Sequence, residues 1–182
     1  MRKGMITIAV VGAVLTPLLW IGYWFWQSEL LLSFAITAGT TTYHFVMRLL
    51  VGYIYDWRMH NRANYERRWF QPLRLEAGLY RFLRVKAWKG RMPSYDPTLF
   101  SHELHSWHEI AQAMCQAELV HETIVLLSFL PVFAVRWFGA EAVFWCTSAA
   151  AALFDLLFVV MQRYNRPRVV RLAQKEQQRT HI

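Results

Sequence analysis

Cysteine is scarce in this sequence, and several common sequence patterns are absent from it. The two cysteines among the 182 residues, Cys115 and Cys146, both lie within apolar segments, so neither a disulfide framework nor a zinc-finger spacing is indicated. Internal repeats and low-complexity segments are missing. No motif that would hold a nucleotide cofactor is present either, which disfavours a small-substrate methyltransferase.

Charged side chains are nearly absent from two long runs at the N-terminal end. Residues 5–26 hold none, and residues 30–55 hold only Arg48 and the ionisable His44. A helix of about 20 residues crosses a hydrocarbon core of ~30 Å, so each run is long enough to span a membrane. Since 55% of the residues are hydrophobic and nine are Trp, a soluble domain of this length has too little core for them. The sequence predicts an integral membrane protein.

The predicted fold is all-α and polytopic, a single integral-membrane domain over residues 1–182. Its four spans are expected at approximately residues 5–26, 30–54, 112–136 and 140–162. We expect the first span to be retained rather than cleaved as a signal peptide, because it is too long and no small-x-small cleavage site follows it.

The segment between the second and third spans, residues 56–110, is too long for a simple turn. It mixes aromatic and leucine side chains with Arg and Lys, which predicts amphipathic interfacial helices lying at the membrane surface. We expect helix to resume near Ser101 and to run into the third span.

Acidic residues are few, with 12 Asp and Glu against 20 Lys and Arg. The basic residues concentrate in residues 56–110 and in the tail, residues 163–182, whereas the other connections are short and almost uncharged. The positive-inside rule then predicts a multi-pass protein of the cell (inner) membrane with both termini in the cytoplasm. Nucleic-acid binding is disfavoured, because anionic lipid headgroups attract the same side chains.

The apolar spans also carry ionisable side chains in helical register. They are His44 and Arg48 in the second span, Glu118, His121 and Glu122 in the third, and Asp155 and Arg163 in or just after the fourth. Such groups are costly in a membrane and normally face the protein interior, which predicts one polar pocket towards the cytoplasmic side. Alternatively, the carboxylates are structural ion-pair partners of Arg48 or Arg163. The separate series His102, His105 and His108 is expected to be solvated or to contact headgroups.

Two chemistries fit this pocket. In the first, His121 is a general base for a hydroxyl nucleophile, oriented by Glu118 or Glu122. The candidate donors to an oxyanion are Arg48, Arg163 and Asn165. In the second, Glu118 and His121 form a Glu-x-x-His metal site of the kind found in helical di-iron enzymes, together with His105, His108 and Asp155. The metal interpretation is the weaker one, because that architecture uses the motif twice and this sequence has it once.

Three short motifs resemble one known family. They are YRFLRVKAWKGRMP at residues 80–93, AELVH at residues 117–121 and MQRYNRPRVVRL at residues 161–172. In this order on a four-span chain, they resemble the glycosyl-4,4'-diaponeurosporenoate acyltransferase family. Those proteins are small bacterial membrane enzymes, and the named activity esterifies a fatty acyl chain onto the sugar of a glycosylated carotenoid acid.

The resemblance implies a membrane O-acyltransferase that acts on a lipid-linked sugar. The positions that match the family motifs are Lys86, Trp88, Lys89, Pro93, Glu118, His121, Arg163, Asn165, Arg166, Pro167 and Arg168. The three-histidine series and the His44/Arg48 pair are not part of that pattern. They leave the acceptor open, either a glycosylated carotenoid acid or another lipid.

Combining the residues with the resemblance gives a candidate site. The expected catalytic residues are His121, Glu118, Asn165 and Arg163. The expected substrate-binding residues are Lys86, Trp88, Lys89, Arg48, His44, Glu122, Asp155, Arg166 and Arg168. The basic group around Trp88 would bind an anionic donor headgroup, or would serve only as a headgroup anchor. Asn165 and Arg166 would cap the last helix, which Pro167 would prevent from continuing smoothly.

No resident metal or cofactor is expected, and the acyl donor (acyl-CoA, an acyl carrier or a phospholipid) is a co-substrate. The expected partners are membrane lipids, the lipid-linked acceptor and the donor, without nucleic acid; a homo-oligomer is compatible with four helices around a lipid pocket. Two other classes stay open, a metal-dependent membrane lipid oxidoreductase and a non-catalytic lipid-binding subunit.

Overall fold

The structure, a computed structural model, describes residues 2–93 and 95–180, and every regular element in these ranges is helical. Four helical segments are long and apolar enough to cross a membrane: Arg2–Trp26, Glu29–Met59, Trp107–Phe138 and Glu141–Arg179. The predicted all-α polytopic membrane fold is thereby confirmed. The cytoplasmic placement of the termini stays a prediction.

The chain folds into two compact units, and each is described by itself. Unit 1 comprises Met1–Tyr53 and Thr123–Asp155, and unit 2 comprises Ile54–Glu122 and Leu156–Ile182. The boundaries between the units fall within three helices, which are α2 (Glu29–Met59), α5 (Trp107–Leu127) and α7 (Glu141–Thr180). The grouping of the whole chain into one integral-membrane domain stays a prediction.

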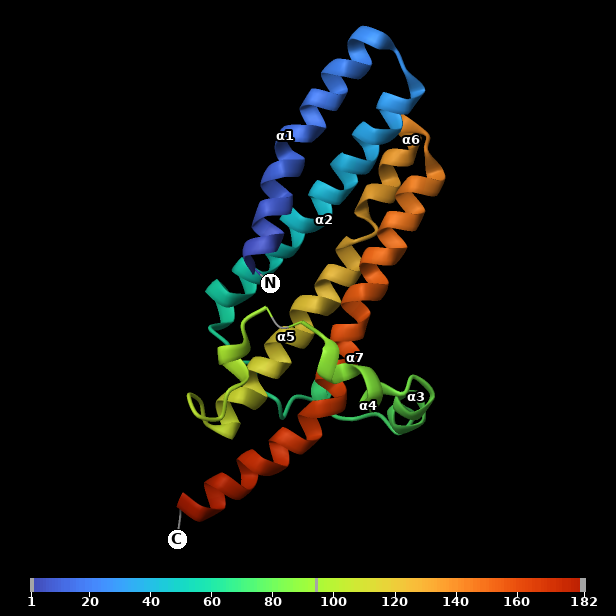
Figure 1. The fold of residues 1–182 in the computed structure, drawn as a ribbon. Coiled ribbons are helices and arrows are strands. Elements are labelled where there is room, and N and C mark those ends of the chain that lie inside the picture. Colours follow the sequence, from blue (N-terminus) through green and yellow to red (C-terminus); the bar gives the residue numbers. More distant parts are fainter. Residues whose placement is uncertain (1, 94, 181–182) are drawn as a thin grey trace. The chain divides into compact units, whose positions relative to one another are not determined.

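In unit 1, α1 (Arg2–Trp26) and the first part of α2 form an antiparallel pair (Figure 1). The chain turns between them at Gln27, which has a positive φ of 46°. The two helices approach closely at Gly12, where an added Cβ would lie 2.1 Å from Oγ1 of Thr42. Because glycine has no Cβ, it permits this approach.

Pro131 interrupts the third apolar segment, also in unit 1. The α-helical part of α5 ends at Leu127, and a 3-10 helix (Leu130–Ala134) and α6 (Val135–Phe138) follow. Proline has no amide hydrogen, so a continuous helix would leave the carbonyl of Leu127, four residues earlier, without its usual donor. The hydroxyl of Tyr43 donates to that carbonyl at 2.9 Å instead. A backbone oxygen at membrane depth is thereby satisfied.

Unit 2 contains the interfacial region predicted for residues 56–110. Its regular elements are short: α3 (Glu76–Phe82), α4 (Val85–Trp88) and the 3-10 helices Arg68–Phe70, Lys89–Arg91 and Pro97–Phe100. Several large apolar side chains on and near them stay exposed, namely Leu73, Leu75, Leu79 and Phe82. Apolar side chains among basic ones suit a membrane surface.

The start of the third long helix differs from expectation. Helix was expected to resume near Ser101, but α5 begins at Trp107. The preceding stretch is the 3-10 helix Pro97–Phe100, which the side chain of Asp96 caps by accepting from the backbone N–H of Thr98 at 3.0 Å.

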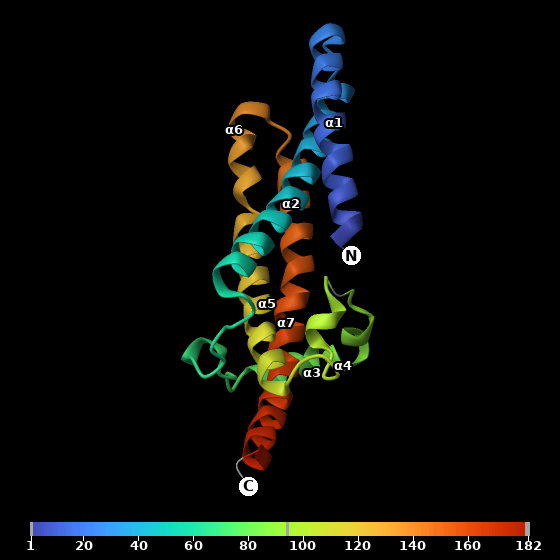
Figure 2. The ribbon, with the colours of Figure 1, turned by 90° about the vertical axis from the view of Figure 1, so that its left-hand side faces the viewer.

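The last helix also differs, because α7 passes through Pro167 and continues to Thr180. The expectation that Asn165 and Arg166 would cap this helix is therefore wrong, because both lie inside it and the helix does not end at Pro167. Tertiary contacts hold the stretch beyond the proline. Ala173 is fully buried, and the carboxylate of Glu176 accepts from the backbone N–H of Trp107 at 3.0 Å. In unit 2, α7 lies beside α5, and α3 and α4 lie close to it (Figures 1 and 2).

Candidate active site

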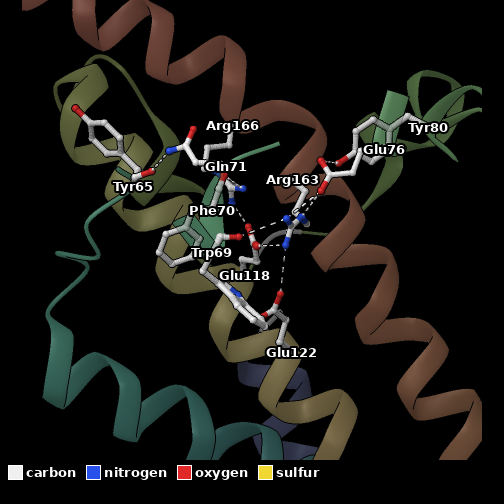
Figure 3. Close-up of polar contacts among 10 residues, drawn as sticks. All are labelled: Tyr65, Trp69, Phe70, Gln71, Glu76, Tyr80, Glu118, Glu122, Arg163 and Arg166. Carbon is white, nitrogen blue, oxygen red and sulfur yellow. Dashed lines mark hydrogen bonds and ion pairs between the residues drawn. The ribbon is translucent and has the colours of Figure 1, made fainter. Parts of the chain in front are cut away.

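Glu118 is a fully buried carboxylate on α5 in unit 2, with none of its surface exposed. Nη1 of Arg163 donates to its Oε1 at 2.9 Å, and Nη1 of Arg166 donates to its Oε2. The two arginines are three residues apart on α7 and therefore share one face of that helix. A buried carboxylate is costly unless it is paired, and here each oxygen has its own guanidinium partner (Figure 3).

Arg163 also connects α7 to α3 and to the segment that precedes it. Its Nε donates to Oε1 of Glu76 at 3.0 Å, and its Nη2 donates to the carbonyl of Trp69 at 3.4 Å. Its Nη1 lies 3.7 Å from Oε1 of Glu122. One guanidinium thus contacts three carboxylates that come from two different helices, α3 and α5.

Arg166 makes the second connection and is only 2% exposed. Its Nη2 donates to the carbonyl oxygen of Phe70, and its guanidinium carbon lies 5.2 Å from the centroid of the Phe70 ring. A guanidinium over an aromatic face gains cation–π attraction in addition to the hydrogen bond. The short 3-10 helix that contains Phe70 is therefore fastened to α7.

Tyr80 and Trp69 donate hydrogen bonds to the other two carboxylates near Arg163, those of Glu76 and Glu122. The hydroxyl of Tyr80 donates to Oε2 of Glu76 at 2.7 Å, and Nε1 of Trp69 donates to Oε2 of Glu122 at 2.9 Å. Burial, and then the bond to Glu76, raise the pKa of Tyr80, so the phenol keeps its proton. We call the set the Glu118 cluster; its members are Trp69, Phe70, Glu76, Tyr80, Glu118, Glu122, Arg163 and Arg166 (Figure 3).

Lys89 and Asn165 form a second polar contact in unit 2. Nζ of Lys89 donates to Oδ1 of Asn165 at 2.6 Å and lies 4.6 Å from the centroid of the Tyr164 ring. Burial lowers the pKa of Lys89, and the positive charges of Arg168 and Lys86 lower it further. A lysine ammonium has three donors, so this one can still bind an anion while it holds Asn165.

His121 is half-buried and lies one helical turn beyond Glu118 on α5. Its ring stacks on the ring of Phe158, with centroids 4.5 Å apart and an interplanar angle of 6°. The ion pair between Glu118 and Arg163, which the alternative interpretation expected, is present. Because both oxygens of Glu118 already accept from guanidinium groups, its expected role in orienting His121 stays a prediction.

Three of the expected substrate-binding residues, His44, Arg48 and Asp155, form a group of their own in unit 1. Arg48 is ion-paired with Asp155, and its Nη2 also donates to the carbonyl of Ala151 at 3.2 Å. Its Nη1 donates to the carbonyl of His44 at 3.0 Å. Their meeting with Glu118 and His121 in one common pocket stays a prediction.

The other expected binding residues lie at or near the surface of unit 2. Lys86 and Arg168 are exposed, and Trp88 is half-buried with its Nε1 donating to the carbonyl of Leu83 at 2.9 Å. The binding of a donor headgroup by these residues is untested by this geometry.

The histidines before α5 make separate contacts. Nδ1 of His108 lies 3.1 Å from the hydroxyl of Tyr65, and the ring of His102 stacks on Trp107. Nδ1 of His105 lies 3.9 Å from Oε2 of Glu109. Within residues 2–93 and 95–180, no three His, Cys, Asp or Glu side chains are placed to share a metal ion.

Sequence reasoning did not place four members of the cluster in the site, namely Trp69, Phe70, Glu76 and Tyr80. Glu76 is the only carboxylate in the basic stretch of residues 67–95, and it lies four residues before the tyrosine that opens the motif at residues 80–93. An isolated acid at helical spacing from a motif residue was an available signal.

Comparison with known proteins gives one match. The family model for glycosyl-4,4'-diaponeurosporenoate acyltransferase matches residues 66–175. No curated protein and no solved structure matches the chain. The matched range contains the entire Glu118 cluster together with Lys89, His121 and Asn165, whereas His44 and Arg48 lie outside it.

Proposed function

Because the chain belongs to the glycosyl-4,4'-diaponeurosporenoate acyltransferase family, we propose that it moves a fatty acyl chain onto a hydroxyl group of a lipid-linked sugar at the cytoplasmic side of the cell membrane. Acyl transfer is the activity of the family. The nature of the acceptor, the identity of the donor and the side of the membrane are the proposed parts.

The proposed reaction is a single acyl transfer from a donor to the acceptor hydroxyl. The hydroxyl oxygen attacks the carbonyl carbon of the donor, an ester C–O bond forms, and the bond between that carbon and the donor's leaving group breaks. His121 takes the hydroxyl proton and returns it to the leaving group. An imidazole suits both steps because a ring nitrogen can accept a proton and then donate it.

Lys89 and Asn165 are the proposed contacts for the donor. Lys89 is half-buried and keeps donors beyond the one that it gives to Asn165. An ammonium group at this position can bind the phosphates of acyl-CoA, an acyl carrier or a phospholipid, with the exposed Lys86 adding to the attraction. The amide of Asn165 would donate to the oxygen that gains negative charge during attack.

Arg163 is proposed as a positioning residue, although the sequence suggested a catalytic one. Its donors are directed to Glu76, Glu118 and the carbonyl of Trp69. With its guanidinium so engaged, its contribution is to hold α7, and hence Asn165, in register with α5 and His121. Glu118 and Arg166 act in the same way.

The observation that carries the proposal is the Glu118 cluster itself. It lies wholly within the range matched by the family model, and it joins α5, which bears His121, to α7, which bears Asn165. A site for acyl transfer needs such rigid support, because small displacements of reacting groups reduce the rate strongly.

The test is lipid mass spectrometry of membranes from a host that makes glycosylated lipids. Four samples at matched protein level are compared: the wild-type protein, His121→Ala, His102→Ala as the histidine control, and empty vector. We expect a lipid heavier by one acyl residue in the wild type and in His102→Ala, and none in the other two.

Each other result changes a specific part of the proposal. Full product from His121→Ala would overturn the role of the general base. Identical lipids in all samples would overturn acyl transfer to a lipid-linked sugar and favour the non-catalytic lipid-binding subunit. A lipid shifted by oxygen or hydrogen instead would favour the oxidoreductase.

A further inference from the structure

Unit 1 contains an apolar cavity of about 300 Å³. Side chains of α1, α2, α6 and α7 line it, among them Trp20, Ile36, Phe138 and Phe144, together with Pro131 from the broken third segment. The hydroxyl groups of the two polar side chains in its wall, Thr40 and Tyr43, have hydrogen-bond partners within the protein. The Thr40 hydroxyl donates to the carbonyl of Ile36 at 2.9 Å, and the Tyr43 hydroxyl donates to Leu127.

Two buried polar side chains of the same unit are not satisfied. Within residues 2–93 and 95–180, neither ring nitrogen of His44 has a hydrogen-bond partner, and neither has Oγ of Ser148, although these residues are 5% and 0% exposed. Leaving buried donors and acceptors unpaired is costly in protein, and more so at membrane depth. Ionisable side chains in such positions commonly mark a ligand or an ion pathway.

Each of the two side chains lies one helical turn beyond a residue that lines the cavity. On α2, His44 comes one helical turn after Thr40, and on α7, Ser148 comes one turn after Phe144; Thr40 and Phe144 line the cavity. In unit 1 the two helices run in the same direction (Figures 1 and 2). Just beyond the residues that line the apolar cavity, α2 and α7 therefore each carry one unpaired polar side chain, His44 and Ser148.

One turn beyond His44 on α2, Arg48 forms an ion pair with Asp155, which lies two turns beyond Ser148 on α7. Arg48 is already engaged by Asp155 and by the carbonyls of His44 and Ala151. Its charge is thus neutralised by its own partner. A ligand with a charged headgroup would find no spare counter-ion there, whereas a neutral group that donates and accepts hydrogen bonds would satisfy an imidazole and a hydroxyl.

We propose that unit 1 binds a single-chain lipid, with its apolar chain in the cavity and a neutral hydrogen-bonding head on His44 and Ser148. The head is the hydroxyl of a lipid alcohol or the carbonyl of an acyl ester, which share this chemistry. The site is separate from the proposed transfer chemistry, since neither residue belongs to the Glu118 cluster.

The test uses photoactivatable long-chain probes on the full-length protein in nanodiscs. Three probes carry the same chain and diazirine but end in a hydroxyl, a methyl ester or a plain alkyl group. The variants are wild type, His44→Leu with Ser148→Ala, and Thr147→Val. The last is the control, because the Thr147 hydroxyl is already bonded to the carbonyl of Val143 at 2.7 Å.

We expect the hydroxyl probe, the ester probe or both to label peptides of α2 and α7 in the wild type and in Thr147→Val. In the double variant that labelling should fall about tenfold, the loss expected for one hydrogen bond to the ligand. The stronger of the two probes identifies the source of the neutral head. Labelling by the alkyl probe should be weak and equal in all three proteins.

Equal labelling by alkyl and headed probes, or full labelling of the double variant, would overturn the proposal. If the double variant fails to fold, a competition experiment on the wild type tests the proposal instead. An unlabelled long-chain alcohol or ester should then displace the headed probe, and an alkane of the same length should not. Displacement by the alkane would overturn the polar part of the site.

Discussion

The two units differ in the partners that their buried charged and polar side chains have. In unit 2, Arg163 and Arg166 pair with Glu118 and also fasten segments far away in sequence, through Glu76 and the carbonyl of Phe70. In unit 1, Arg48 pairs with Asp155, whereas the side chains of His44 and Ser148 have no hydrogen-bond partner among the residues that the structure describes.

This difference shows that buried polar side chains can have two roles in a membrane protein. A cluster in which every buried charge has protein partners contributes rigidity, because each bond fixes two elements relative to each other. A buried polar group without a protein partner leaves its hydrogen bonds open to a ligand. The Glu118 cluster therefore supports a site, and His44 and Ser148 mark a candidate site.

The largest effect is expected from breaking the Glu118 cluster. Glu118→Ala leaves two buried guanidinium groups without their shared carboxylate and should lower the free energy of unfolding by about 3–5 kcal/mol. Thermal unfolding in detergent measures the loss, and the acylated lipid should disappear with it.

Glu122→Gln is the matched control for that change. Glu122 is more exposed and lies 3.7 Å from Arg163, so this variant should lose far less stability. Equal losses from Glu118→Ala and Glu122→Gln would show that the buried carboxylate does not organise the cluster.

A smaller effect is expected from the ion pair of unit 1. Asp155→Asn removes the charge that neutralises Arg48, but the carbonyls of His44 and Ala151 still accept from that guanidinium. We expect a loss of about 1.5–3 kcal/mol, the usual value of a hydrogen bond to a charged group.

The double variant Arg48→Met with Asp155→Leu sharpens this prediction. It removes both charges and should recover most of the stability, because a well-packed apolar pair often replaces a buried ion pair at little cost. Thermal unfolding of the single and double variants compares their stabilities. A double variant less stable than Asp155→Asn would show that the ion pair itself stabilises unit 1.

The smallest effect is expected from Tyr80→Phe, which removes one hydrogen bond to Glu76 and should cost about 1 kcal/mol at neutral pH. Its pH dependence is more informative. Burial and Glu76 raise the pKa of Tyr80 above the ordinary 10.0, so above pH 10 the unfolded chain releases a proton that the folded chain keeps. The free energy of unfolding therefore falls as pH rises through this range.

Tyr80→Phe lacks this contribution, so its stability should fall less steeply than that of the wild type above pH 10. Urea unfolding at a series of alkaline pH values compares the two proteins. Parallel curves would mean that Tyr80 ionises equally in the folded and unfolded chains.

The fold was predictable from sequence because charge-free runs of membrane length are a strong physical signal. The ion pair between Glu118 and Arg163 was also predictable from the sequence, because a carboxylate in a membrane span needs a cationic partner. Helix ends were harder to predict. The continuation of α7 past Pro167 depends on contacts such as Glu176 with the backbone of Trp107, and these outweigh the local effect of a proline.

Spacing along the chain could single out Glu76, but it could not show which residues the arginines of the cluster contact. Glu76 and Arg163 are 87 residues apart in sequence, and the carbonyl of Phe70 carries no side-chain signature at all. Likewise, periodicity places His44 in a polar stripe, but only the folded unit shows that no residue in the described part of the chain forms a hydrogen bond with its two ring nitrogens.

The hydrogen bond from Tyr43 to Leu127 has a consequence for selectivity by size. Tyr43 and Pro131 both line the cavity of unit 1, and the proline is the reason that the carbonyl of Leu127 needs the tyrosine. If Tyr43 swung away to widen the cavity, it would strand a backbone oxygen in hydrocarbon. The part of the wall that Tyr43 forms therefore resists displacement, and in the proposed lipid site we expect it to favour slender chains over branched or ring-bearing ones.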